Sequence, residues 1–355
     1  MPAPFFIVGA SRSGTTLLRL MLNAHSRLAV PDEMKYFRFL EGTDNLEAWN
    51  TPRSPEEYRQ LVEGYVTAHK ALVESVPGAQ DALHRYEEDR TARGPYRAFL
   101  RHWAETCGKA RWGEKTPHNI SFVDVIADMF PGAKFIHVVR DPRAVVQSMN
   151  ASSYYSSETV FNALNWRTAV RDGINLFGDL QPDQHLNIRY EDLVREPAST
   201  LRTVCSFLQE AFEPSMLRFY ETVDQHMAHR IRTPSIKGPV NQSGLSKWRT
   251  RLSPAQVALI EGLCGEEMAG LGCEPEAHVT RGSALALLKQ LYWHWKAWRH
   301  RDRRGFEVVF PFLSGLRKRL GPWTKRLSVR EPTSGPVSHD ARRPTTSQPQ
   351  PPSSS

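Results

Sequence analysis

The chain has 355 residues, of which 40% are hydrophobic and 24% charged. This composition is typical of globular proteins and excludes a chain that is disordered over its whole length. The longest strongly apolar stretch, residues 5–10, is far shorter than the roughly 20 residues that span a membrane. Residues 1–4 show neither the basic region nor the apolar run of a signal peptide, so we expect no export signal. The net charge of +8 comes from residues 281–355, which contain 15 Lys/Arg and 4 Asp/Glu. Residues 1–280 have a net charge of −3, which argues against a protein whose main domain binds nucleic acid over its whole surface.

Short apolar runs alternate with helical patterns along the first 280 residues. Runs at Phe5–Val8, Lys134–Val139 and His185–Tyr190 predict buried strands. Helices are predicted directly after the first strand, from Asp141-Pro142 onward with Asp141 as the N-cap, and over residues 197–208 and 254–270. This alternation predicts an α/β fold in which a P-loop-type parallel sheet is flanked by helices on both faces.

The α/β domain is placed at residues 1–280, and two further features are predicted around it. Residues 40–110 carry helical patterns and no obvious strand, so we expect a helical insertion that lies over the sheet. Residues 281–330 are basic and rich in aromatic side chains, and they are predicted to form a helical extension. Residues 331–355, rich in Pro, Ser, Thr and Arg, are predicted to be a disordered tail.

A glycine-rich turn follows the first predicted strand and opens its helix. It reads Gly9-Ala10-Ser11-Arg12-Ser13-Gly14-Thr15-Thr16, in the place where backbone N–H groups and a helix N-terminus bind phosphate oxygens. Thr15 stands where a nucleoside triphosphatase has its lysine, and Arg12 is the cation inside the turn. The turn predicts a site for an anionic ligand that is poorly suited to hydrolysing ATP with magnesium.

A second anion site is predicted after the strand at residues 134–139. Arg140 follows that strand, and Ser148 lies eight residues later, about two turns into the next helix. A guanidinium and a hydroxyl so placed can converge on one phosphate. The alternative is that the charged turn Arg140-Asp141-Pro142-Arg143 is only a capping ion pair.

Together these motifs resemble the sulfotransferases that use 3′-phosphoadenosine 5′-phosphosulfate (PAPS), and most closely the tyrosylprotein sulfotransferase branch and its bacterial relatives. Residues 12–16 resemble the family's 5′-phosphosulfate loop, and residues 140–148 resemble its 3′-phosphate site. The resemblance runs in order from about residue 5 to about residue 248. It implies a sulfuryl transfer from PAPS to an acceptor hydroxyl, with adenosine 3′,5′-bisphosphate released.

The resemblance also implies roles for single residues. Glu33 lies 21 residues after Arg12, at the spacing of the branch's catalytic glutamate, and is the implied general base. Lys115 matches the lysine that contacts the transferring sulfuryl group, and with Arg12 it would stabilise the transition state. The implied nucleotide contacts besides Ser13, Gly14, Thr15 and Thr16 are made by Arg140, Ser148, Tyr190, Asn241 and Lys247.

The sequence departs from the family pattern at two positions. The family's transition-state serine falls on Arg232 when the Pro239-Val240-Asn241 loop is aligned without gaps, which leaves Thr233 or Ser235 to take over that role. A further family arginine falls on Ser152, which removes one cation from the 3′-phosphate site.

Other functions stay open at this point. His118 and His25 are rival general bases. The competing functions are a nucleotide kinase or NTPase-like P-loop enzyme and a non-catalytic, membrane-associated nucleotide-binding module. No His/Cys/Asp/Glu cluster has the spacing of a metal site, so we expect no metal.

The acceptor and the partners are less defined than the donor. Carbohydrate, lipid, small-molecule and peptidyl-tyrosine hydroxyls are all candidate acceptors. The tryptophans and cations of residues 285–326 fit packing on the core, a peripheral membrane contact, or a surface for anions or nucleic acid; we expect no nucleic-acid partner. A homodimer stays open. The four cysteines form no C-x-x-C pair, which favours a reduced, cytoplasmic protein that is either free or peripheral at the membrane.

Overall fold

The computed structural model describes residues 2–43, 45–85, 89–178, 180–221 and 238–276. The predicted extension at 281–330 and the predicted tail at 331–355 lie outside the described residues, as do Arg232, Thr233 and Ser235.

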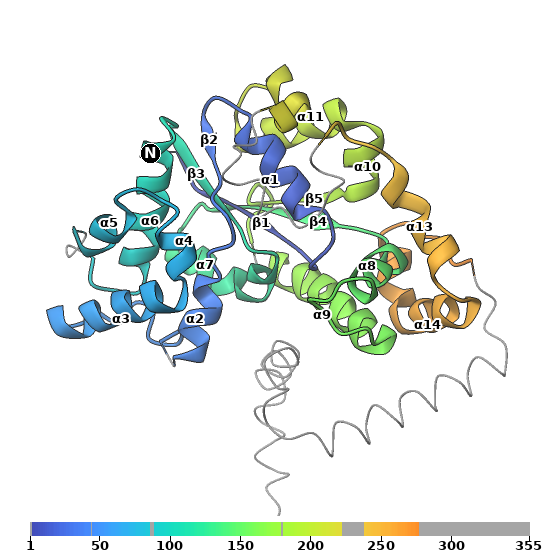
Figure 1. Cartoon of the computed structure of the whole chain (residues 1–355), viewed down its shortest axis with the longest axis horizontal. Coiled ribbons are helices and arrows are strands. Elements are labelled where there is room, and N and C mark those ends of the chain that lie inside the picture. Colours follow the sequence, from blue (N-terminus) through green and yellow to red (C-terminus); the bar gives the residue numbers. More distant parts are fainter. Residues whose placement is uncertain (1, 44, 86–88, 179, 222–237, 277–355) are drawn as a thin grey trace, which may run out of the picture. The chain divides into compact units, whose positions relative to one another are not determined.

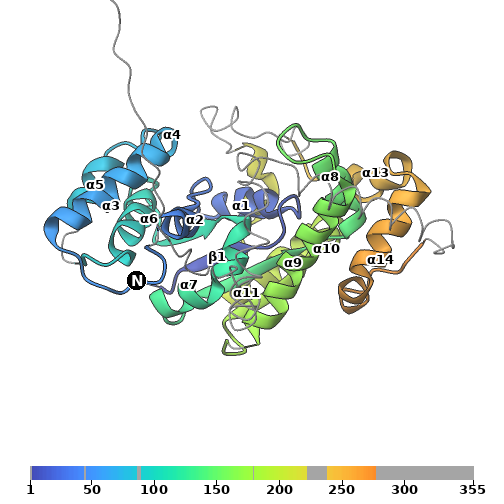
Figure 2. The ribbon, with the colours of Figure 1, turned by 90° about the horizontal axis from the view of Figure 1, so that it is seen from below.

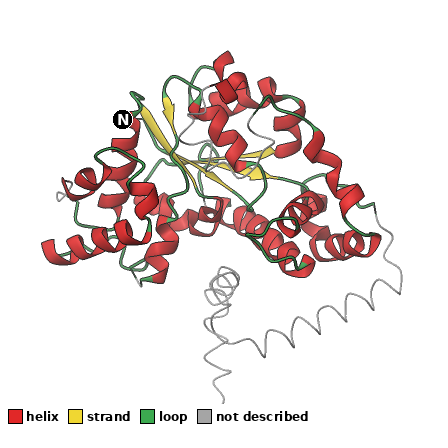
Figure 3. Ribbon diagram, in the orientation of Figure 1, coloured by secondary structure: helices red, strands yellow, loops and turns green. Residues whose placement is uncertain are grey.

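A five-stranded parallel sheet forms the centre, in the strand order β2-β3-β1-β4-β5 (Figure 3). Because every neighbouring pair is parallel, the carboxyl ends of all five strands lie at one edge of the sheet. The strands are β1 (Phe5–Val8), β2 (Leu28–Ala29), β3 (Arg111–Lys115), β4 (Lys134–Val139) and β5 (His185–Arg189).

Helices cover both faces of this sheet, and the alternation of side chains along β1 shows it. Phe6 and Val8 belong to one hydrophobic cluster, whereas Phe5 and Ile7 belong to the other. The first cluster is completed by α7 (Val123–Met129), the 3-10 helix η1 (Pro117–Phe122) and the helices of the insertion. The second is completed by α1 (Thr15–Asn23), α10 (Tyr190–Arg195), α11 (Pro197–Leu208) and the 3-10 helix η2 (Pro214–Glu221).

Four helices form a third cluster beyond β4. Trp166 is its largest fully buried side chain, and its indole Nε1 donates to the carbonyl of Arg140, which fixes the carboxyl end of β4. Figure 1 shows these helices on the opposite side of the sheet from the insertion. They are α8 (Pro142–Asn150), α9 (Thr159–Phe177), α13 (Ser243–Arg251) and α14 (Pro254–Gly270).

The predicted helical insertion lies between β2 and β3. Figures 1 and 2 show its helices gathered beside that end of the sheet, and no strand occurs within its described residues. Stacked and edge-on rings of Tyr36, Tyr65 and Tyr96 tie its helices together, with ring centroids 4.9–5.0 Å apart. Its helices are α2 (Tyr36–Gly42), α3 (Pro55–Ala68), α4 (Lys70–Val73), α5 (Ala79–Arg85) and α6 (Arg93–Thr106).

The predicted α/β fold with its parallel sheet and helical flanks is confirmed, and most predicted elements occur where expected. The strands at 5–8 and 134–139 and the helices at 197–208 and 254–270 have the predicted bounds. Asp141 caps α8 by accepting from the amide of Arg143, and Pro142 occupies the first turn. Tyr190 differs, because it begins α10 instead of ending the strand.

The sequence patterns missed two strands, β2 and β3. With only two residues, β2 is too short to show an alternation. The sequence of β3 is Arg-Trp-Gly-Glu-Lys, which no hydrophobic period marks, yet all five residues are buried. Arg111 is buried because its guanidinium donates to the carbonyls of Ala3 and Leu208.

Candidate active site

The predicted site residues converge at the carboxyl edge of the sheet, and every strand contributes. The glycine-rich turn follows β1, Glu33 follows β2, Lys115 ends β3, Arg140 follows β4 and Tyr190 follows β5. Ligands of open α/β sheets bind at this edge, because the loops that leave parallel strands meet there. Residues as far apart in the chain as Arg12 and Tyr190 are thereby brought to one edge of the sheet.

The glycine-rich turn, residues 9–16, has an unusual backbone, and we call it the anion loop after the ligand that the sequence predicts there. Gly14 precedes α1 with φ of +99°, and a Cβ there would lie 2.2 Å from the ring of Tyr190, so only glycine fits. Arg12 adopts a left-handed φ of +70°, an unfavourable conformation for a residue with a side chain. The Ser13 hydroxyl is fully buried and has no hydrogen-bond partner among the described residues. The N-terminus of α1 and this hydroxyl therefore offer donors to an anion.

Arg12 contacts both Ser148 and Arg140. Arg12 Nε donates to Ser148 Oγ at 3.0 Å, and Arg140 donates to the carbonyls of Arg12 and Gly244, each at 2.9 Å. The Arg140 guanidinium also stacks on the ring of Tyr190, 4.2 Å from its centroid, and burial lowers the pKa of Arg140. The capping-ion-pair alternative does not apply to Arg140, since Asp141 pairs with Arg143.

Glu33 and Lys115 form an ion pair next to α1. Lys115 Nζ lies 2.5 Å from Glu33 Oε1 and 3.5 Å from Thr16 Oγ1. The lysine side chain is almost fully buried, whereas one third of the glutamate side chain is exposed. The arrangement sets a cation beside the anion loop and a carboxylate between that cation and solvent. It can therefore stabilise negative charge and accept a proton at adjacent points.

The two rival histidines differ in their surroundings. His25 is buried, and both its ring nitrogens are held: Nε2 lies 2.8 Å from the carbonyl of Ala211, and Nδ1 accepts from the amide of Arg27. Its role is therefore to tie the end of α1 to the segment before η2. His118 lies in η1 against Phe122, and burial lowers its pKa to about 4, which leaves it neutral near pH 7.

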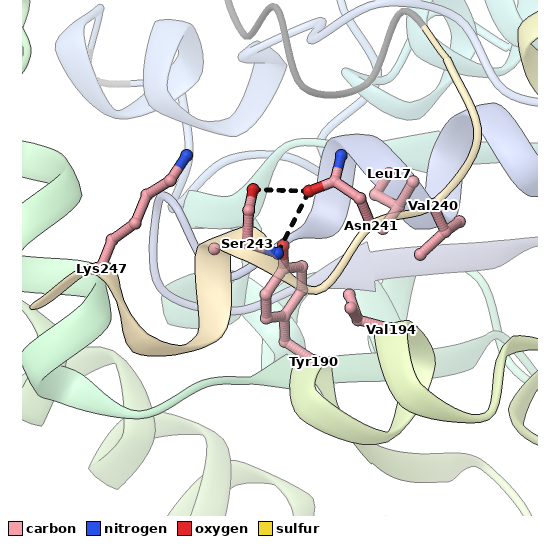
Figure 4. A pocket seen from close by; sticks show the side chains of 8 residues that line it. Leu17, Tyr190, Val194, Val240, Asn241, Ser243 and Lys247 are labelled. Carbon is pink, nitrogen blue, oxygen red and sulfur yellow. Dashed lines mark hydrogen bonds between the residues drawn. The ribbon is translucent and has the colours of Figure 1, made fainter.

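Asn241 and Lys247 line a small cavity together with Tyr190. Asn241 Oδ1 accepts from the hydroxyl of Ser243 at 2.6 Å and from its amide at 3.2 Å, a turn that starts α13 (Figure 4). The small cavity drawn in Figure 4 has a volume of about 30 Å³, room for no more than a water molecule or two. It is lined by Leu17, Tyr190, Val194, Val240, Asn241, Ser243, Gly244 and Lys247.

Sequence reasoning missed several residues of this site. The Tyr155 hydroxyl hydrogen-bonds the Ser11 side chain of the anion loop, and burial raises the pKa of Tyr155. Arg19, buried on α1, pairs with Asp32 at 3.8 Å, directly before Glu33. Glu114 is a fully buried carboxyl beside Lys115. The sequence offers a signal only for Arg19, which lies among the apolar residues of α1. Glu114 has no such signal, because the sequence of β3 shows no hydrophobic alternation.

Two further findings concern the described part of the chain. No helix there is long and apolar enough to cross a membrane. The same residues contain no group of three or more His, Cys, Asp or Glu side chains that could hold a metal ion.

The chain is similar to known proteins over the region that carries this site. The profile of a family described as "Sulfotransferase family" matches residues 4–214, more than half of the chain. Protein-tyrosine sulfotransferase 1 of Danio rerio is 27% identical over 290 residues, which cover 77% of this chain and 73% of that protein. The Homo sapiens protein of the same name is 26% identical over 285 residues, covering 77% of this chain and 70% of its own length.

Solved structures show the same fold. The sulfotransferase domain from the Synechococcus PCC 7002 olefin synthase has a TM-score of 0.55 and 24% identity, covering 76% of this chain and 96% of that one. The sulfotransferase domain from the curacin biosynthetic pathway has a TM-score of 0.53 and 21% identity, covering 78% of this chain and 99% of that one.

Proposed function

This chain belongs to the sulfotransferase family, and we propose that it transfers a sulfuryl group from PAPS to the hydroxyl of an acceptor. The observation that carries the proposal is the Glu33–Lys115 ion pair beside the anion loop. Lys115 Nζ lies 2.5 Å from Glu33 Oε1 and 3.5 Å from Thr16 Oγ1. A base and a cation at adjacent points are what an in-line transfer between two oxygens requires.

Glu33 is the proposed general base. The acceptor hydroxyl gives its proton to the Glu33 carboxylate while its oxygen forms the new bond to sulfur. The bond between that sulfur and the bridging oxygen of the 5′-phosphosulfate breaks, and adenosine 3′,5′-bisphosphate leaves with the electron pair. The partial exposure of Glu33 supports this role, because the acceptor must reach the carboxylate from solvent.

Lys115 and Arg12 are the proposed stabilisers of the transition state. Negative charge develops on the bridging oxygen as the sulfur–oxygen bond breaks, and a buried ammonium beside it acts in a water-poor site where its effect is strong. Lys115 must turn from Glu33 toward the donor to take this role, which also frees the carboxylate to accept the proton.

The remaining residues of the site are proposed to hold the nucleotide. Ser13, Gly14, Thr15 and Thr16 would receive the 5′-phosphosulfate on the amides of α1, and Arg140 and Ser148 would receive the 3′-phosphate. Tyr190, Asn241 and Lys247 would surround the adenosine.

Two lines of reasoning separate this proposal from its rivals. The kinase or NTPase alternative lacks its loop lysine, since Thr15 stands there, and family membership argues against it. A non-catalytic nucleotide-binding module would not require Glu33 for any measured activity. The acceptor class (carbohydrate, lipid, small molecule or peptidyl tyrosine), the homodimer and the membrane contact through residues 285–326 stay predictions.

Calorimetric titration of the full chain tests the donor site. We expect micromolar binding of adenosine 3′,5′-bisphosphate and much weaker binding of ATP with magnesium. A positive result leads to transfer assays with PAPS and one acceptor from each class. Tight ATP binding without bisphosphate binding would overturn the proposal and favour the kinase alternative.

A further inference from the structure

Glu114 is a buried carboxyl in the site that no step of the proposed reaction uses. It precedes Lys115 on β3 and has no exposed surface. Its Oε1 accepts from Thr116 Oγ1 at 2.5 Å and from the Met34 amide at 3.3 Å, and its Oε2 accepts from Asn119 Nδ2 at 2.5 Å. A buried carboxyl costs free energy unless its oxygens are paired in this way, so its presence beside Lys115 calls for a reason.

The contacts of Glu114 belong to a wider set that holds the segment after Glu33. The Lys35 amide donates to Thr116 Oγ1 at 3.3 Å. The carbonyl of Met34 accepts from the hydroxyl of Tyr65, on α3, at 3.0 Å. Both amides that follow Glu33, and the carbonyl between them, are therefore held by side chains of β3, of the residue after it, and of the insertion.

The backbone of this segment is held in an unfavourable conformation. Lys35 has a left-handed φ of +51°, a conformation that is unfavourable for a residue with a side chain and persists only where the surroundings impose it. The hydrogen bonds of Glu114, Thr116 and Tyr65 supply that constraint. They also fix the path of the chain by which Glu33 meets Lys115.

We propose that Glu114, with Thr116 and Tyr65, is a positioning residue that holds Glu33 in register with Lys115 and with the acceptor. The inference rests on the proposed function, since it assigns Glu33 as the base. Glu114 accepts hydrogen bonds from Met34, Thr116 and Asn119. Glu114 therefore acts on Glu33 indirectly, through the backbone of Met34.

The proposal has a pH signature. Burial raises the pKa of Glu114 to about 7, so its ionisation changes within the working range of most enzymes. The groups that face it are Glu33 on the loop, Lys115 on its own strand, Tyr65 on α3 and Tyr96 on α6. An ionised carboxylate accepts from the Met34 amide more strongly than a carboxylic acid does, so the positioning is firmest above about pH 7.

Glu114→Gln tests the assignment, because the amide keeps the shape and removes the ionisation. At saturating PAPS and acceptor, we expect kcat to fall about tenfold or more, since small displacements of a catalytic group are costly. We expect the wild-type kcat to decline as pH falls through about 7 and this decline to be absent in the variant. Affinity for adenosine 3′,5′-bisphosphate should stay within about twofold. An unchanged kcat and pH profile would overturn the proposal.

Two tyrosines of α3 offer a matched comparison. Tyr65→Phe removes the hydrogen bond to Met34, whereas Tyr58→Phe removes one from an equally buried hydroxyl to the carbonyl of Leu83, away from Glu33. Each variant removes a hydrogen bond to a backbone carbonyl, but only Tyr65→Phe should lower kcat. Equal losses in both, or losses that follow the melting temperature, would mean that these residues act through stability alone and would overturn the proposal.

Hydrogen exchange separates failure of this inference from failure of the proposed function. The Met34 and Lys35 amides should be protected in the full chain, and Glu114→Gln should speed exchange at Met34 in particular. This measurement needs no PAPS. Fast exchange at Met34 in the wild type would overturn the positioning role, whereas protection together with absent sulfuryl transfer would overturn the proposed function alone.

Discussion

At the residue scale, the Glu33–Lys115 pair connects stability with the proposed chemistry. Lys115 is almost fully buried, so its charge depends on a partner, and Glu33 provides one in this structure. Removing Glu33 leaves the charge of the buried lysine without a partner, which costs much free energy of folding. Removing Lys115 leaves a carboxylate that is one-third exposed, which costs little. Glu33 is therefore best replaced by glutamine, whose side-chain carbonyl can still accept from the buried lysine.

Glu33→Gln should lower kcat by about 10²–10⁴, because a general base contributes that much, while affinity for adenosine 3′,5′-bisphosphate stays unchanged. Steady-state transfer assays and titration measure the two quantities. Glu47→Gln, at an exposed position just past α2, is the control and should match the wild type. A Glu33→Gln enzyme with wild-type turnover would leave the non-catalytic module, or another base such as His118, as the better interpretation.

Arg140→Ala should weaken binding of adenosine 3′,5′-bisphosphate by about 10- to 100-fold, since hydrogen bonds to charged groups contribute about 1.5–3 kcal/mol. Binding of adenosine 5′-monophosphate, which lacks the 3′-phosphate, should change much less. Titration of both ligands with both proteins isolates the contribution of the 3′-phosphate. If the variant lost equal affinity for the two ligands, Arg140 would serve the Tyr190 stack and the loop backbone instead of the 3′-phosphate.

At the element scale, local sequence signals set where the helices begin. Ser54 and Glu57 form a capping box at the start of α3, and Ser253 and Gln256 form another at the start of α14. Proline occupies the first turn of both helices, where its missing N–H is no loss. The strands differ, because β2 and β3 are recognisable only through their pairing with β1 and with each other.

Ser54→Ala should lower the free energy of unfolding by about 1 kcal/mol, the usual contribution of an N-cap, without changing kcat or nucleotide affinity. Chemical denaturation of the full chain measures the loss. Ser253→Ala removes the equivalent cap of α14 and should give a loss of similar size. A drop in kcat for Ser54→Ala would show that the position of α3 reaches the site more directly than the Tyr65 contact accounts for.

At the scale of the whole molecule, buried titratable groups couple folding to pH. His137, in β4, is buried, hydrogen-bonded to Asn187 and neutral, because burial lowers its pKa to about 4. Unfolded chains bind a proton at such a histidine near pH 6.5, so its contribution to stability is present above that pH. Glu114 contributes with the opposite sign, since its pKa is raised to about 7.

The free energy of unfolding contributed by His137 should be lost as pH falls from about 6.5 to about 4. His137→Asn, which keeps a donor for Asn187 and cannot titrate, should flatten the pH dependence of stability in that window. Denaturation curves at a series of pH values, with wild type and variant compared at each, measure the difference. Identical slopes in both proteins would mean that His137 binds its proton equally well in the folded state.

The sequence by itself determined those features that depend on neighbours along the chain. The anion loop, the Asp141 cap, the helices at 197–208 and 254–270 and the two apolar strands at 5–8 and 134–139 are all set by local backbone preference and hydrophobic period. The residues that follow those two strands could be placed at one edge of the sheet, because parallel strands bring their carboxyl ends together.

Only the tertiary structure decided the features that depend on partners distant in the chain. Lys115 and Glu33 are 82 residues apart, and Arg12 and Ser148 are 136 apart, so their contacts follow from the strand order and not from any local pattern. The same holds for Glu114, whose burial is tolerable only because Met34, Thr116 and Asn119 donate to it. From the sequence alone, such charged residues are predicted to be exposed, because the partners that allow their burial are brought to them only by the fold.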